Sequence, residues 1–138
     1  MTRAYAANGL NQYTQSGSRT ITYSPTGNLV NDGTWRFSYD GEDRMSKAET
    51  PPDTPTTTIT FSYDAFSRMR SRTENGVATT NLYDGDDLIG EYDNATGALL
   101  RRYVHGPGID DPVVQYDGSG TSSRTFLHAD RMGSVIAT

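Results

Sequence analysis

The chain has 138 residues and a formal net charge of −5, from 17 acidic and 12 basic residues. Hydrophobic residues make up 33% of it, against ~45–50% in ordinary globular chains, so we expect thin sheets with wet faces and no thick core. The acidic balance argues against nucleic acid as a partner, and the absence of cysteine excludes a disulfide framework and thiolate chemistry. No secretory leader and no apolar run of about 18 residues occurs, so we expect neither a signal peptide nor a membrane span.

The first third of the chain is predicted to form short hairpins. Turn signals stand at 8–9 and 16–17, and the runs 20–23 and 28–30 flank a type I turn at 24–27. These turns return the chain on itself every few residues. We therefore expect a meander of short antiparallel strands.

The stretch 34–39 alternates between large and small or polar side chains. Trp35, Phe37 and Tyr39 fall on one side, which predicts a half-buried strand with the only Trp on its inner face. Residues 49–57 contain three Pro residues, which remove three backbone donors, and are predicted to be a surface loop.

The middle of the chain carries the clearest hairpin signal. Asn75-Gly76 supplies the two positive-φ residues of a type I′ turn. Counting outward from this turn sets Glu74 opposite Val77 and Arg72 opposite Thr79. A third hairpin is predicted from 88–92 and 98–105, and a fourth from 113–116 and 124–128, and no window shows the apolar period of a helix. The predicted fold class is all-β: successive antiparallel hairpins that form a strip or a spiral sheet.

A Tyr-Asp pair recurs along the chain between the predicted strands. Tyr is a good strand residue, and an Asp directly after it can cap the following turn, so we predict a structural role for each pair. The pairs are Tyr39-Asp40, Tyr63-Asp64, Tyr83-Asp84, Tyr92-Asp93 and Tyr116-Asp117, with Tyr23-Ser24 as a degenerate copy.

These motifs resemble the YD repeats of bacterial RHS proteins, which are related to teneurins and to shell proteins of toxin complexes. The segment 126–137, FLHADRMGSVIA, is similar to the RHS-associated core signature through His128, Asp130, Gly133 and Ser134. The resemblance implies that residues 1–138 are a single fragment of a β-rich shell that encloses or displays a C-terminal toxin. It implies a secreted or cell-surface bacterial protein, with that effector and neighbouring RHS repeats as partners.

Full RHS cores end in a self-cleaving Asp-Pro-x-Gly-Leu segment, and this chain departs from that pattern. Asp111-Pro112 is followed by two Val residues and precedes the core signature, so the aspartyl dyad is not carried over.

A few acidic, histidine and serine residues could in principle bind a metal or act in catalysis. The group Asp84, Asp86 and Asp87 offers oxygens for Ca²⁺ but lacks the EF-hand pattern, which favours a solvated turn. His105 and His128 are the only imidazoles, and the serines available to them, Ser123 and Ser134, lie in no nucleophile elbow. We therefore predict no catalytic residue, no metal, no cofactor and no enzyme activity.

Two alternatives to the shell role stay open. Exposed aromatic side chains next to Asp and Arg suit a carbohydrate or cell-surface binding module, with Trp35 as its ligand face. Open strand edges pair with other copies unless charge or Pro blunts them, which predicts self-association or a filamentous β-protein.

Overall fold

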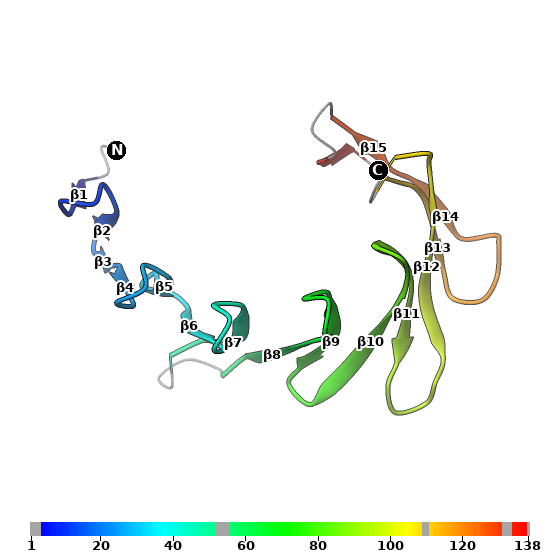
Figure 1. Cartoon of the computed structure of the whole chain (residues 1–138), viewed down its shortest axis with the longest axis horizontal. Helices are drawn as coiled ribbons and strands as arrows, with labels where there is room; N and C mark the ends of the chain where they lie inside the picture. The colour runs from blue at the N-terminus through cyan, green and yellow to red at the C-terminus, as the bar shows by residue number, and fades with distance from the viewer. Residues whose placement is uncertain (1–3, 52–55, 109–110, 131–133, 138) are drawn as a thin grey trace. The chain divides into compact units, whose positions relative to one another are not determined.

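The computed structural model of the chain describes residues 4–51, 56–108, 111–130 and 134–137. All regular structure in these residues is β-strand, and none of them forms a helix long and apolar enough to cross a membrane. The chain divides into two compact units, Met1–Phe61 and Ser62–Thr138, drawn from blue to green and from green to red in Figure 1. That residues 1–138 form a single fragment built from YD repeats stays a prediction.

The first unit is built of short antiparallel strands in two sheets. Its strands are β1 (Tyr5–Ala7), β2 (Tyr13–Ser16), β3 (Arg19–Thr20), β4 (Thr22–Tyr23), β5 (Leu29–Asn31), β6 (Arg36–Tyr39), β7 (Met45–Glu49) and β8 (Thr58–Tyr63), the last of which crosses into the second unit. Of these, β1, β2 and β3 form one sheet, and β4 to β8 belong to a second sheet. The strands are short because a turn interrupts the chain every few residues. The predicted Pro-rich loop joins β7 to β8, and its residues 52–55 lie outside the described residues.

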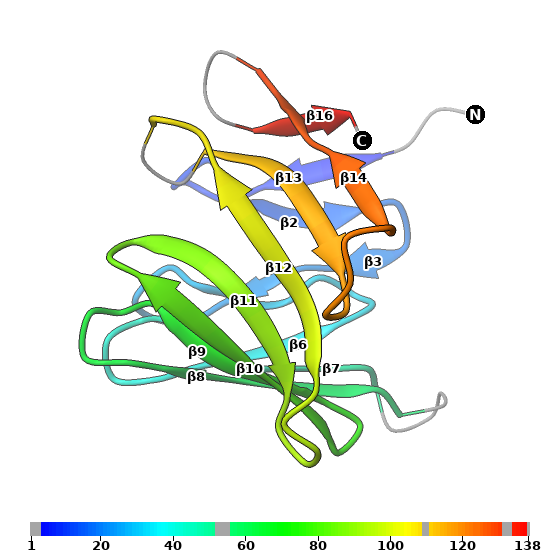
Figure 2. The ribbon, with the colours of Figure 1, turned by 90° about the vertical axis from the view of Figure 1, so that its right-hand side faces the viewer.

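The second unit contains longer strands in the same up-and-down order. They are β9 (Met69–Glu74), β10 (Val77–Asp84), β11 (Asp87–Asp93), β12 (Leu99–His105), β13 (Pro112–Asp117) and β14 (Arg124–Phe126), followed by the separate pair β15 (His128–Ala129) and β16 (Val135–Ala137). Figure 2 shows β9 to β13 side by side. The predicted all-β fold of antiparallel hairpins in an open strip is confirmed.

The central hairpin forms as the turn chemistry predicts. Asn75 and Gly76 have φ values of 49° and 89°, and β9 and β10 pair Glu74 with Val77 and Arg72 with Thr79. Asn and Gly tolerate positive φ at low cost, so the two-residue turn closes without strain.

Two predicted strands are shorter than expected. The strand predicted at 34–39 begins at Arg36, because Asp32 holds a turn in which its Oδ1 accepts the N–H groups of Thr34 and Trp35, both at 2.7 Å. The strand predicted at 124–128 ends at Phe126, because His128 pairs instead with Ala137 in the separate β15–β16 ladder. Local capping and a competing strand partner set these boundaries.

The sheet has almost no closed core. Ala48 is the only hydrophobic residue among the described ones that is buried, with 7% exposed. β6 shows the expected alternation, since Phe37 and Tyr39 are half-buried while Arg36 and Ser38 are exposed. With so little closed apolar volume, hydrogen bonds in turns and between strands become the main determinants of the fold.

Candidate functional site

Five turns of the chain share one hydrogen-bonded frame, which we call the capped turn. They occupy residues 8–12, 24–28, 40–44, 64–68 and 130–134. In each, the N–H of the first residue donates to the C=O of the fifth, at 2.8 to 2.9 Å. A side-chain oxygen of the first residue accepts the N–H of the fifth, at 3.0 to 3.1 Å. The first residue therefore closes the turn twice, once through its backbone N–H and once through its side-chain oxygen.

The fourth residue of the capped turn has positive φ wherever the structure describes it. The values are 60° at Asn11, 90° at Gly27, 59° at Asp43 and 62° at Ser67. Gly133, the equivalent residue of the last turn, lies outside the described residues. Two of the five Tyr-Asp pairs, Tyr39-Asp40 and Tyr63-Asp64, therefore begin a capped turn, and Asp130 makes the same two closing hydrogen bonds with Ser134.

The turn signal at 8–9 predicted a turn there, but not a capped turn, because no Tyr-Asp pair precedes it. The signal that identifies it is a polar cap residue, Asn8, followed three residues later by Asn11, a residue type that tolerates positive φ. The first residues of the turns at 8, 24 and 40 are then evenly spaced along the sequence.

Two capped turns carry an additional arginine. The Nε of Arg44 donates to Oδ2 of Asp40 at 2.8 Å, and the Nε of Arg68 donates to Oδ2 of Asp64 at the same distance. A second guanidinium nitrogen, Nη2, contacts the same Oδ2 in each pair, at 2.8 and 2.7 Å, and leaves Oδ1 to the backbone N–H groups.

The electrostatics of these two carboxylates follow from the same contacts. Partial burial raises the pKa of Asp40 and Asp64, but the backbone and side-chain hydrogen bonds from Arg44 and Arg68 outweigh it. The net result is a pKa below the usual value for both carboxylates. They are ionised at neutral pH, as their capping role requires.

Arg68 connects its capped turn to the next part of the sheet. Its guanidinium lies 4.8 Å from the ring centre of Tyr83 and 5.1 Å from that of Phe66, and it donates to the carbonyl of Gly85. One arginine thus joins an ion pair, two cation–π contacts and a backbone carbonyl.

Tyrosine hydroxyl groups join three of the capped turns to the following hairpin. Tyr23 donates to the carbonyl of Tyr13 at 3.1 Å, Tyr39 to that of Leu29 at 2.8 Å and Tyr83 to that of Met69 at 2.9 Å. Each acceptor lies five residues after the first residue of a capped turn. These tyrosines therefore have two structural roles: their rings cover part of the sheet surface, and their hydroxyl groups hold a backbone carbonyl.

The other residues of the predicted Tyr-Asp pairs make different contacts from one another. Asp93 Oδ1 accepts the side chain and the backbone N–H of Thr96, which lowers the pKa of Asp93 despite partial burial. Tyr116 lies under the guanidinium of Arg102, at 4.7 Å, and Asp117 Oδ2 accepts from the hydroxyl of Ser123 at 3.2 Å. The others lie in strands: Tyr63 in β8 and Tyr92 in β11, both half-buried, and Asp84 at the exposed end of β10.

The residues considered for chemistry lie in turns and strands. Asp84 stands opposite Asp87 across a tight turn, and the described residues contain no group of three or more potential metal-ligating side chains. Asp130 caps its turn on Ser134, and His128 is an exposed residue of β15. Trp35 is half-buried directly before β6, and its role as a ligand face stays a prediction.

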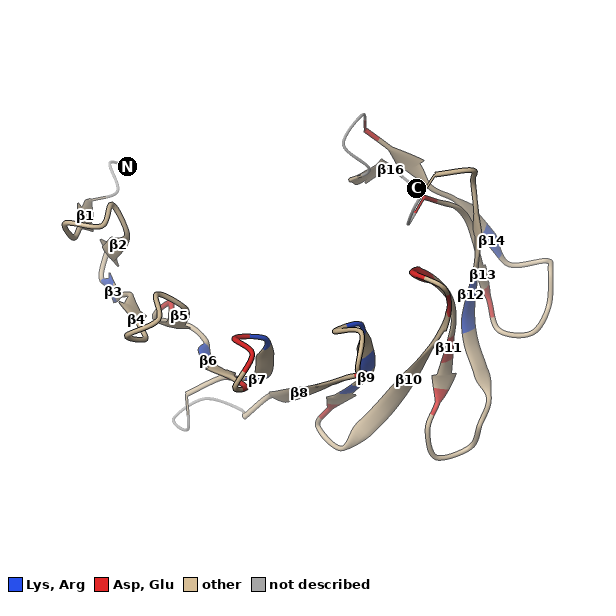
Figure 3. Cartoon of the chain, viewed as in Figure 1, with Lys and Arg blue, Asp and Glu red and all other residues tan. Residues whose placement is uncertain are grey.

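A polar row crosses the second unit where four strands stand in register. Asn81 of β10 faces Glu91 of β11, Glu91 faces Arg101 of β12, and Arg101 faces Asp117 of β13. Directly paired residues point to the same side of a sheet, so these side chains stand in line. Figure 3 shows the basic residues of β9 and β12 and the acidic residues of β11 on neighbouring ribbons.

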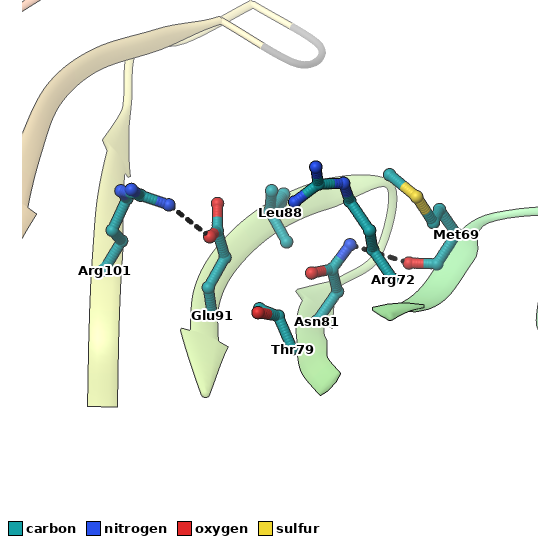
Figure 4. A pocket seen from close by; sticks show the side chains of 7 residues that line it. All are labelled: Met69, Arg72, Thr79, Asn81, Leu88, Glu91 and Arg101. Atoms are coloured by element: carbon teal, nitrogen blue, oxygen red, sulfur yellow. Dashed lines mark hydrogen bonds and ion pairs between the residues drawn. The ribbon is translucent and has the colours of Figure 1, made fainter. Parts of the chain in front are cut away.

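A pocket of about 250 Å³ opens over this row. Its walls are formed by Met69, Arg72, Thr79, Asn81, Leu88, Glu91 and Arg101, as Figure 4 shows. The side chain of Glu91 is only 15% exposed, and its carboxylate accepts hydrogen bonds from Arg101 at 2.8 Å and from the hydroxyl of Tyr103 at 2.6 Å. Sequence analysis did not identify this pocket.

The pocket is electrically balanced. Arg101 pairs with Glu91, and Arg72 pairs with Glu74. The hydrogen bond to Glu91 raises the pKa of Arg101, and burial, followed by the bond to the same carboxylate, raises the pKa of Tyr103. Glu91 is thereby held as a fixed acceptor between two donors.

Comparison with known proteins relates the chain to nucleases. It is 30% identical over 131 residues to the tRNA3(Ser)-specific nuclease WapA of Bacillus spizizenii, and the match covers 94% of the chain and 5% of that protein. It is 29% identical to the tRNA nuclease WapA of Bacillus subtilis strain 168 and 30% identical to the tRNA(Glu)-specific nuclease WapA of Bacillus subtilis subsp. natto, with the same coverage. No protein-family model matches the chain.

These findings correct three predictions. The RHS assignment is corrected, because the relatives matched over 94% of the chain are named WapA tRNA nucleases. The predicted shell role, with its carbohydrate-binding and filament alternatives, and the prediction of no enzyme activity are overturned by the same names. The Tyr-Asp motifs misled the prediction because they report a local turn structure, which does not determine function.

Proposed function

We propose that this chain is a β-sheet segment of a larger protein that cleaves tRNA. The observation that carries the proposal is the match to a tRNA3(Ser)-specific nuclease over 94% of the chain. Because the chain spans only 5% of the length of that relative, the cleavage is proposed for the whole protein. The net charge of −5 makes this segment a weak electrostatic partner for tRNA, which also places the main RNA contacts elsewhere in the protein.

The test uses the whole protein that contains residues 1–138. It is incubated with total bacterial tRNA, and the products are separated on denaturing gels and sequenced at their new ends. We expect cleavage at defined positions in a small set of tRNAs. Intact tRNA after incubation with folded full-length protein would refute the proposal, and the isolated chain run in parallel shows how much of any activity this segment carries.

For partners, we propose the remaining strands of the same long polypeptide. The support is that the chain covers a small part of its relatives and that β14 pairs on one side with β13, among the described strands. Edge strands present unpaired backbone groups that another strand can satisfy, which also makes the isolated chain prone to self-association. Light scattering tests this proposal. The isolated chain should self-associate, whereas the full-length protein, whose own strands cover the edge, should not. A secreted or cell-surface location and an effector partner stay proposals from the sequence.

A further inference from the structure

We propose that the pocket over the polar row binds a guanine base, with Glu91 as the residue that recognises it. The inference rests on the proposed function, since RNA supplies the base, and it names a ligand for a site on this segment. The acceptor is Glu91, whose carboxylate is held by Arg101 at 2.8 Å and by Tyr103 at 2.6 Å. A carboxylate offers about four acceptor positions, so two remain for a ligand.

The size and charge of the pocket favour a base over a whole nucleotide. Its volume of about 250 Å³ lies below the roughly 300–1,000 Å³ of sites that enclose drug-sized ligands. The pairs Arg101–Glu91 and Arg72–Glu74 leave no net positive charge to attract a phosphate. A neutral planar group therefore fits better than an anion.

The order of donors and acceptors along the row selects guanine. Guanine presents N–H donors at N1 and N2 next to acceptors at O6 and N7. In the row, the acceptor Glu91 stands next to the donor Arg101, which uses one of its five N–H groups on Glu91. Adenine, cytosine and uracil do not present two adjacent donors followed by an acceptor on one edge. Glu91 would accept from N1 and N2, and Arg101 would donate to O6.

The walls of the pocket supply the apolar surface that a base requires. Met69 lines it at the end away from Arg101, and Leu88 lies between Glu91 and Arg72, as seen in Figure 4. Asn81 does not compete for the ligand through its amide nitrogen, because that group donates to the carbonyl of Met69 at 2.8 Å. Unstacked bases of single-stranded RNA are recognised by stacking on an aromatic ring or an Arg guanidinium plane and by hydrogen bonds to their edges, and Arg72 is a planar group that lines this pocket.

The first test changes the ligand and leaves the protein intact. Binding of guanosine, inosine, 1-methylguanosine and adenosine to the 138-residue chain is measured by calorimetry or by ligand-detected NMR. Inosine lacks the N2 amine and 1-methylguanosine lacks the N1 proton, so each should bind about 5- to 150-fold more weakly than guanosine. Equal binding of all four nucleosides, or no binding of guanosine, would overturn the proposal.

The second test changes the protein. Glu91→Gln replaces one acceptor by a donor and should reduce guanosine affinity by the same factor. Glu49→Gln is the matched control, since Glu49 is a strand carboxylate paired with Lys47 at 2.9 Å, and it should bind guanosine normally. Equal affinities of the two variants would refute the role of Glu91.

A salt series separates base recognition from phosphate binding. Base recognition predicts that guanosine and guanosine monophosphate bind with similar affinity and that added salt changes this affinity little. A steep loss of affinity with salt would show phosphate binding instead and would overturn the proposal. Nucleoside binding involves no cleavage, so it can fail while the full-length protein cleaves tRNA, and it can succeed where cleavage fails.

Discussion

The two units use the same capped turn but depend on it to different degrees. In the first unit, β1 to β7 have two to five residues, and three capped turns stand along 45 residues of meander. In the second unit, β9 to β13 have six to eight residues, and the two capped turns lie outside this run of strands, at 64–68 before it and between Asp130 and Ser134 after it. Short strands make few ladder bonds, so the first unit depends on its turns and the second on its ladder.

Contacts between neighbouring turns strengthen this contrast. In the first unit, the side chain of Gln12 donates to the carbonyl of Gly27 at 3.4 Å, and that of Asn28 donates to Asp43 at 2.7 Å. In the second unit, the strands carry cross-strand contacts such as those of Glu91 with Arg101 and Tyr103. A sheet without a closed core can thus be stabilised either at its turns or across its strands.

The largest expected effect comes from removing a cap in the first unit. Asp40→Ala deletes the acceptor of two backbone N–H groups and of Arg44, and we expect hydrogen-exchange protection to be lost across β5 to β7. The same change at Asp64 should act more locally, because β9 to β13 retain their ladder. Hydrogen exchange resolved by segment is the measurement.

Asp84→Ala serves as the control for this pair, since Asp84 is exposed at the end of β10. Equal losses of protection in the Asp40 and Asp64 variants would contradict the contrast between the units.

Lowering the pH should remove the stability that the carboxylates of Asp40 and Asp64 contribute. The pKa values of Asp40 and Asp64 lie below the usual value when the chain is folded. Their contribution to stability is therefore present above the unfolded pKa of about 3.9 and is lost as the pH falls through the lower folded values. Urea midpoints of the parent chain and of Asp40→Asn should differ at neutral pH and converge in acid. A difference that persists unchanged below about pH 2 would exclude ionisation as its source.

A smaller effect is expected at the turn of the central hairpin. Gly76 has φ of 89°, and a Cβ there would meet no atom within 4 Å, so Gly76→Ala tests backbone conformation alone. We expect a loss of about 1–2 kcal/mol in unfolding free energy, measured by urea denaturation. Gly41→Ala is the control, since its Cβ also has open space and its φ is not positive. A cost for Gly41→Ala as large as that for Gly76→Ala would contradict this reasoning.

The smallest effect is expected for the tyrosine hydroxyls. Tyr39→Phe and Tyr83→Phe each remove a hydrogen bond to a carbonyl, of Leu29 and of Met69, and Tyr83→Phe also removes the long contact from the amide of Asn81 at 3.4 Å. Each should lower the unfolding free energy by about 0.5–1.5 kcal/mol, measured by thermal denaturation. Tyr5→Phe, at an exposed position with 57% of the residue accessible, should change it little. Identical melting curves for all three variants would show that the hydroxyl contacts are not formed in solution.

The sequence alone determined the fold class and most hairpins, because turn chemistry is local. Asn75-Gly76 can close only a narrow range of turns, and Asp40 and Asp64 cap residues within four positions of themselves. For the same reason the sequence indicated which residues shape the turns, although it did not show that Asn8 begins a further capped turn.

Only the tertiary structure decided which distant residues meet. The row from Asn81 through Glu91 to Arg101 depends on register shifts at Leu82/Tyr83 and at Glu91/Tyr92, which counting from the turns does not foresee. A shift of one residue exchanges the two faces of a strand, so the pocket exists only for the register that the folded sheet adopts. The acceptors of Tyr39 and Tyr83 are decided in the same way, since each lies on another strand, at a distance that only folding closes.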